Sequence, residues 1–340
     1  MQPIRFCTCS LALGSLIFLS ACGGKEKEVI KSTDALVAER KYDQALMVLQ
    51  KALREDPKNK ILLRHQVRLF LKSEQVNYAI AAYRKLSDVS PDDKVLFETL
   101  KDKDKVVRIT TAKALGLMKT PNSVGSLMAA AKDEEKSVRQ ASILALGDLK
   151  DPKAIPVLIG ALKDHDWYVR AEAALALGKV GDSQATTELF KLLTDDDSYV
   201  RQNARKALQE LATQENKSAY LEALKSSDPA ISNMAAIALA QSGDKIALPM
   251  LIQQLSGAKS LDQLEIIRAM VKLADPSAVP SLREALAVDD DTEVRALAAL
   301  ALGEFKDRES VELLKKIAQD KTADRRLVTA CLISLNKISR

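Results

Sequence analysis

A valine–arginine pair followed by an alanine-rich run recurs about every 31 residues along most of the chain. The arginine of each copy, here called the index residue, is replaced by another polar residue in two copies. The index residues are Arg108, Arg139, Arg170, Arg201, Ser232, Gln263, Arg295 and Arg326. An alanine stands six residues after every index residue except the last. A period of this length predicts that the chain stacks one small structural unit many times and does not fold around a single core.

The residues around each index residue predict an amphipathic helix. Offsets −1, +3, +4 and +7 share one helical face and are mostly Val, Ala and Leu, so this face should be packed. An acid four residues before most index residues can cap free N–H groups and pair with an arginine. These acids are Asp104, Glu135, Asp166, Asp197, Asp228 and Asp291. Partner helices are expected at Pro152–Lys163, Lys245–Leu255, Pro276–Ala287 and Ser310–Gln319.

Composition supports a helical chain. The sequence has only 12 glycines and 10 prolines among 340 residues, and aromatic residues make up 4 %. Few turn residues and an aliphatic core fit helix after helix with short connections. We therefore predict an all-α fold, an α-solenoid in which helical hairpins form a superhelix, with eight copies in residues 92–340. The repeated motif resembles the HEAT-like repeats of the phycobilisome lyases.

A second period, of 34 residues, covers residues 29–91. Ala45, Leu46, Leu49 and Pro57 recur as Ala79, Ile80, Tyr83 and Pro91. The stretch Tyr42-Asp43-Gln44-Ala45-Leu46 resembles the second half of a tetratricopeptide repeat, which implies a short array of two helical hairpins.

The N-terminal residues have the pattern of an export signal: Arg5, a short apolar run over Leu11–Leu19, and small residues before Cys22. Leu19-Ser20-Ala21-Cys22 resembles the lipobox of bacterial lipoproteins. That resemblance implies a signal peptide over residues 1–21, a lipidated Cys22 and a charged tether over residues 22–28. Gly23, where retained lipoproteins often carry aspartate, favours the outer membrane facing the periplasm. An ordinary signal with a chance cysteine is the alternative.

The sequence offers little for catalysis. It has two histidines, His65 and His165, and neither precedes a glutamate as in the iron-binding motifs of deoxyhypusine hydroxylases. It contains no phosphate-binding glycine loop and no zinc spacing. The charge of +5 is modest for nucleic-acid binding. We therefore expect no catalytic residues, no cofactor, no metal, no nucleic acid and no small-molecule substrate.

The single tryptophan lies in Asp164-His165-Asp166-Trp167-Tyr168. This segment can be an acidic–aromatic site or simply the turn between two helices. The matching segment Asp195-Asp196-Asp197-Ser198-Tyr199, one period later, favours the turn.

Solenoids expose long surfaces and act mainly by binding other chains. The sequence therefore predicts a lipid-anchored, non-catalytic scaffold of the cell envelope that binds protein partners. The alternative is an accessory subunit of an envelope enzyme or transport system. Offsets +1 and +2 are expected to face the inner surface, and they become apolar near the C-terminus, which makes Leu297, Leu327 and Val328 candidate partner-binding residues. The alternative is that the last helix buries Leu327 and Val328.

Overall fold

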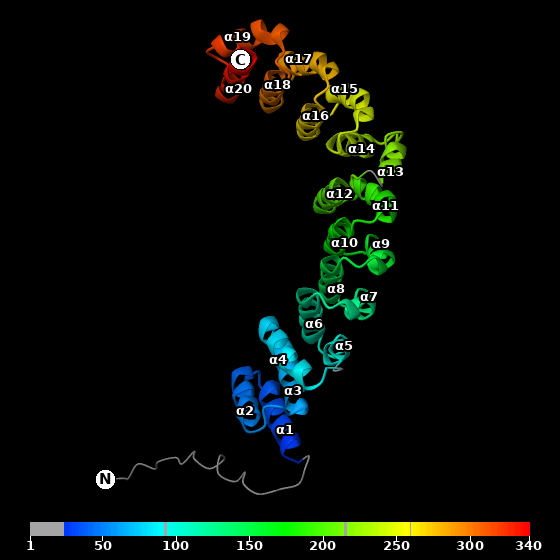
Figure 1. Ribbon diagram of the computed structural model, residues 1–340, viewed down its shortest axis with the longest axis vertical. Helices are drawn as coiled ribbons and strands as arrows, with labels where there is room; N and C mark the ends of the chain where they lie inside the picture. Colours follow the sequence, from blue (N-terminus) through cyan, green and yellow to red (C-terminus); the bar gives the residue numbers. More distant parts are fainter. Residues whose placement is uncertain (1–23, 92–93, 214–215, 259) are drawn as a thin grey trace, which may run out of the picture. The chain divides into compact units, whose positions relative to one another are not determined.

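The computed structural model describes residues 24–91, 94–213, 216–258 and 260–340. Within these ranges the chain is made of α-helices and short 3-10 segments, without a strand. It divides into two compact units, residues 1–118 and 119–340. The predicted all-α solenoid of helical hairpins is confirmed (Figure 1). The predicted signal peptide and Cys22 lie outside the described residues.

The first unit contains six helices in its described part: α1 (Gly24–Ala38), α2 (Tyr42–Glu55), α3 (Lys60–Lys72), α4 (Val76–Val89), α5 (Val95–Thr99) and α6 (Lys105–Met118). Ala45 and Ala79, which are 34 residues apart, are both fully buried. Arg40 and Glu74, also 34 apart, both have a left-handed backbone, with φ of 59° and 60°. The 34-residue period is therefore a period of the structure as well as of the sequence.

Residues 24–28 differ from the expected tether, because they form the start of α1. Lys25 makes an ion pair with Glu55 of α2 at 2.6 Å. The side-chain amide of Asn59 donates to Glu26 at 3.0 Å. These contacts hold the charged segment as helix against its neighbours.

The second unit is a row of seven helical hairpins in its described residues. Its helices are α7 (Val124–Ala130), α8 (Lys136–Leu149), α9 (Ile155–Ala161), α10 (Trp167–Val180), α11 (Thr186–Lys191), α12 (Ser198–Glu210), α13 (Lys217–Ala223), α14 (Pro229–Gln241), α15 (Leu248–Leu255), α16 (Ser260–Leu273), α17 (Val279–Val288), α18 (Thr292–Glu304), α19 (Val311–Gln319) and α20 (Arg325–Ile338). In Figure 1 the second helices of the hairpins form one layer and the first helices form the other. Together with α5 and α6, the eight expected hairpins are present.

In four hairpins the buried face of the second helix is shown to be the one the pattern predicts. The valines at offset −1 and the leucines at offset +7 are at most 1 % exposed in four hairpins: Val138, Val169, Val200 and Val294, and Leu146, Leu177, Leu208 and Leu302. They form a core between the two layers, as the helical period requires.

Small residues set the spacing between neighbouring second helices. A Cβ atom added at Gly147 would lie 2.9 Å from Cα of Ala176 in the next hairpin. A Cβ atom added at Gly178 would lie at the same distance from Cα of Ala207. The alanine at offset +6 therefore packs against the glycine at offset +8 of the preceding helix, and only small residues allow this approach.

Two of the index arginines, Arg139 and Arg170, connect successive hairpins. Arg139 donates to both carboxylate oxygens of Asp164 in the next hairpin, at 2.8 and 2.9 Å. Arg170 does the same to Asp195, at 2.8 Å for both bonds. Each arginine also donates to carbonyls of the turn before its own helix. Arginine–acid pairs between adjacent hairpins are therefore present, but their acids are Asp164 and Asp195, two residues before the predicted Asp166 and Asp197, which cap the helices instead. The pairs are charge-assisted and bidentate.

Candidate functional surface

The three predicted partner-binding residues do not form an exposed strip. Leu327 is 2 % exposed, and Leu297 and Val328 are half-buried. The expectation of exposure at Leu327 is wrong, and the alternative of a buried residue holds there. Partner binding at Leu297 and Val328 stays a prediction.

The burial of Leu327 follows from a change of register in the last hairpin. Helix α20 is capped by Asp324, and the Val328 N–H donates to the Asp324 carbonyl at 3.0 Å, as Arg295 does to Asp291 in α18. Val328, and not Arg326, therefore occupies the index position, 33 residues after Arg295. This places Leu327 at the buried offset −1.

Other parts of the last hairpin agree with this register. A Cβ atom added at Gly303 would lie 2.9 Å from Cα of Ser334, so Ser334 takes the place of the alanine at offset +6. Ser334 is fully buried and donates to the Ala299 carbonyl at 2.7 Å. Ser334 is therefore the small residue at the place where α18 and α20 approach each other. The sequence pattern with Arg326 as index residue did not predict this role for Ser334.

Offset +2 is buried in most hairpins and does not face outward as expected. The residues at this offset are between 0 and 6 % exposed in four successive second helices: Ala141, Glu172, Asn203 and Met234. Offset +2 lies one turn before offset +6, on the side that packs against the preceding helix. The inner surface is therefore built from other offsets.

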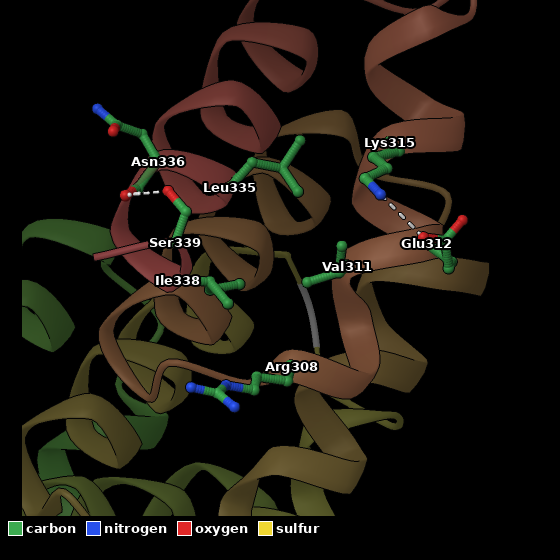
Figure 2. A pocket seen from close by; sticks show the side chains of 8 residues that line it. All are labelled: Arg308, Val311, Glu312, Lys315, Leu335, Asn336, Ile338 and Ser339. Atoms are coloured by element: carbon green, nitrogen blue, oxygen red, sulfur yellow. Dashed lines mark hydrogen bonds and ion pairs between the residues drawn. The ribbon is translucent and has the colours of Figure 1, made fainter.

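The last hairpin carries a groove of about 740 Å³ between α19 and α20 (Figure 2). Val311, Leu335 and Ile338 supply its apolar side chains, and an ion pair of Lys315 and Glu312 at 3.0 Å stands at its edge. In the new register Leu335 is at offset +7, which is fully covered in interior hairpins. The groove thus exposes part of the face that interior hairpins bury.

An ion pair crosses the surface of α14. Arg205 of α12 donates to Asp262 at 2.8 Å and to Glu265 at 3.3 Å, both on α16, two hairpins further on. Helix α14 lies between them and is buried over nine consecutive residues, 232–240. The layer of second helices therefore offers no exposed side chain of α14 over these residues.

An aromatic cluster lies where α10 and α12 begin. Trp167 is in edge contact with Tyr168 and with Tyr199, with ring centroids 5.4 and 5.8 Å apart. The two tyrosine rings are parallel, with centroids 6.2 Å apart. Trp167 is 45 % exposed and Tyr199 is 40 % exposed. The turn interpretation of this segment is correct for the backbone, since Asp166 caps α10. The contact between aromatic rings from two successive turns was not predicted from the sequence.

Two polar side chains follow the tyrosines one helical turn later. Glu172, four residues after Tyr168, is 5 % exposed, and burial raises the pKa of its carboxyl, while the Tyr168 hydroxyl donates a hydrogen bond that lowers it. Asn203, four residues after Tyr199, is 6 % exposed, and its side-chain N–H₂ group has no hydrogen-bond partner. Glu172 belongs to α10 and Asn203 to α12, and these two helices pack against each other. An unpaired buried donor is costly and unusual in a folded protein.

Other reactive groups are few in the part of the chain that the structure describes. Cys331 is fully buried, and burial raises the pKa of its thiol to about 11. His65 belongs to α3, and its Nε2 lies 2.7 Å from the hydroxyl of Thr33 on α1. Among the described residues no three His, Cys, Asp or Glu side chains form a possible metal site. In the same ranges no helix combines the length and the apolar character needed to cross a membrane.

A family model for HEAT repeats matches the chain over residues 64–143, 93–178, 124–209, 186–260 and 248–335. The first match begins within the stretch that has the 34-residue period. No curated protein sequence matches the chain.

Several solved structures are similar to this chain. Importin beta is 14 % identical with a TM-score of 0.54, over 93 % of this chain and 50 % of that one. The phycocyanin lyase complex from Nostoc is 19 % identical with a TM-score of 0.36, over 72 % of this chain and 94 % of that one. Human deoxyhypusine hydroxylase is 23 % identical with a TM-score of 0.33, over 79 % of this chain and 99 % of that one. At these identities the likeness concerns the fold alone.

The expectation that the chain is not an enzyme needs correction. Two of the similar solenoids are named as a phycocyanin lyase complex and a hydroxylase. The absence of short catalytic motifs does not exclude catalysis, because catalytic groups on a repeat fold can come from scattered side chains. The exclusion of catalysis is therefore withdrawn.

Proposed function

Because this chain belongs to the HEAT-repeat family, we propose that it is a lipid-anchored scaffold of the bacterial cell envelope that binds protein partners along its solenoid surface. The row of hairpins in residues 119–340 is the observation that carries the proposal. Stacked hairpins expose a long surface made of many short, separately variable segments, which suits the recognition of another chain.

The proposed membrane anchor is the lipidated thiol of Cys22, after removal of residues 1–21. The segment Leu19-Ser20-Ala21-Cys22 supports it. Gly23 favours the outer membrane, facing the periplasm, as the destination. Since α1 begins at Gly24, the tether between lipid and first helix would be very short, which would keep the solenoid close to the bilayer. The helices over residues 29–91 are proposed to be tetratricopeptide-like, which the buried Ala45 and Ala79 support.

Two experiments test the proposal. In the producing cell, Cys22→Ala should leave an uncut precursor or release the chain from membranes, whereas the matched variant Cys331→Ala should fractionate like the natural chain. Crosslinking in membranes followed by purification should then capture a defined partner protein with the natural chain. Normal fractionation of Cys22→Ala at mature size contradicts the anchor, and the absence of any captured protein contradicts the scaffold.

A further inference from the structure

The aromatic cluster of Trp167, Tyr168 and Tyr199 is an unusual surface for this chain. The sequence has one tryptophan and six tyrosines in 340 residues, and three of these seven side chains are in mutual contact here. Interior packing does not account for it, since Trp167 and Tyr199 are 45 % and 40 % exposed. Exposed aromatic rings that touch one another are typical of binding surfaces.

The charges around the cluster favour a cation. Five aspartates lie in the two turns that precede α10 and α12: Asp164, Asp166, Asp195, Asp196 and Asp197.

The basic side chains nearby are already engaged. Arg139 and Arg170 are bound to Asp164 and Asp195. Lys136 is paired with Asp166 at 2.9 Å. Arg201 donates to the carbonyls of its own turn, including that of the exposed Asp196. Asp164, Asp166 and Asp195 are neutralised by these pairs, and the exposed carboxylate that an incoming cation would meet beside the rings is that of Asp196.

The geometry also limits the form of the cation. The rings contact one another at 5.4 to 6.2 Å, which leaves no room among them for a further group. A ligand must lie on the outer faces of Trp167 and Tyr199. A planar guanidinium on a long stem can stack on such faces and donate to aspartates at the same time. The unpaired N–H₂ group of Asn203, one turn below Tyr199, is a donor for which the folded chain supplies no acceptor.

We propose that the cluster of Trp167, Tyr168 and Tyr199 binds an arginine side chain presented by a partner protein, with the exposed Asp196 providing the negative charge. This inference rests on the proposed scaffold function and assigns the place and the chemistry of one contact.

Trp167 makes the test direct, because it is the only tryptophan of the chain. The probe is a synthetic peptide of alternating glycine and arginine, titrated against the full chain while Trp167 emission is recorded. The same peptide with citrulline in place of arginine keeps the planar shape but removes the charge. Tyr199→Ala removes one ring face and keeps the reporter, Tyr199→Phe keeps the ring, and Tyr78→Ala removes an exposed tyrosine of the other unit as a matched control.

The arginine peptide should change Trp167 emission in the natural chain, in Tyr199→Phe and in Tyr78→Ala, and the citrulline peptide should not. Tyr199→Ala should weaken binding by about tenfold, the scale of one cation–π contact with its desolvation. An equal response to citrulline, an unchanged affinity in Tyr199→Ala, or no response in the natural chain overturns the proposal. A thermal melt of each variant verifies that Tyr199→Ala remains folded.

A second measurement separates this inference from the proposed function. Partner capture in membranes is repeated with Trp167→Ala. If the natural chain captures a partner and Trp167→Ala captures it equally well, the aromatic site is wrong while the scaffold stands. If the natural chain captures nothing, the scaffold itself fails, whatever the peptide shows.

Discussion

Replacing Gly147 by alanine tests whether close helix approach sets the spacing of the hairpins. The added Cβ would lie 2.9 Å from both Cα and Cβ of Ala176, whereas carbon atoms in contact prefer about 3.5–4.0 Å. The atoms in the way belong to the backbone of α10 and to a side chain without torsions, so they cannot turn aside. Overpacking of this kind costs about 1–3 kcal/mol. The higher helix propensity of alanine relative to glycine offsets about 1 kcal/mol of this cost. We therefore expect the free energy of unfolding to fall by about 1 kcal/mol.

Gly160→Ala is the matched control, because it has the same propensity gain without the contact. A Cβ at Gly160, inside α9, meets no atom within 4 Å. This variant should raise the free energy of unfolding by about 0.5–1 kcal/mol. Urea unfolding followed by Trp167 emission reports both variants, since Trp167 begins α10. If Gly147→Ala stabilises the chain as much as Gly160→Ala does, the argument that packing requires glycine there is refuted.

Three further predictions concern single contacts. Arg170→Ala should destabilise the array by about 3 kcal/mol in urea unfolding, because it leaves the largely buried Asp195 without its partner, and equal stability would mean that this pair is unimportant. His65 should make α1 and α3 less stable in acid: burial lowers its pKa, so the folded chain binds fewer protons, and stability present above about pH 6.5 is lost as pH falls towards the lowered folded value. Hydrogen exchange of these helices at several pH values checks this, and His65→Gln should flatten the slope. Leu327→Ser should lower the melting temperature by several degrees and Val328→Ser by much less; the reverse order would contradict the register of α20.

The repeat structure could be read from the sequence because its signals are local. A helix needs an apolar stripe and a capping acid, and both recur at fixed offsets. Asp166, Asp197 and Asp291 cap α10, α12 and α18 as expected. The turns after the second helices are periodic too, with a left-handed backbone at Lys150 and Gly181, but only some of these residues are glycines, so composition did not mark them.

The register of the last hairpin is where the local pattern misled. Arg326 continues the period of 31, so the sequence favours it as index residue. The structure uses Val328, because Asp324 caps the helix and Ser334 fits beneath Gly303. A shift of two residues turns a helix by more than half a revolution, and it moved Leu327 from the expected surface into the core.

The sequence by itself determined the fold class and the number of hairpins, because both depend on contacts that repeat with the chain. The aromatic cluster depends on a different kind of contact. Trp167 and Tyr199 are 32 residues apart, and each looks like part of an ordinary turn. Their rings meet only because small residues let α10 and α12 pack closely, which brings successive turns side by side. Only the tertiary structure could place them on one surface, since the distance between neighbouring hairpins is set by packing and not by any single segment.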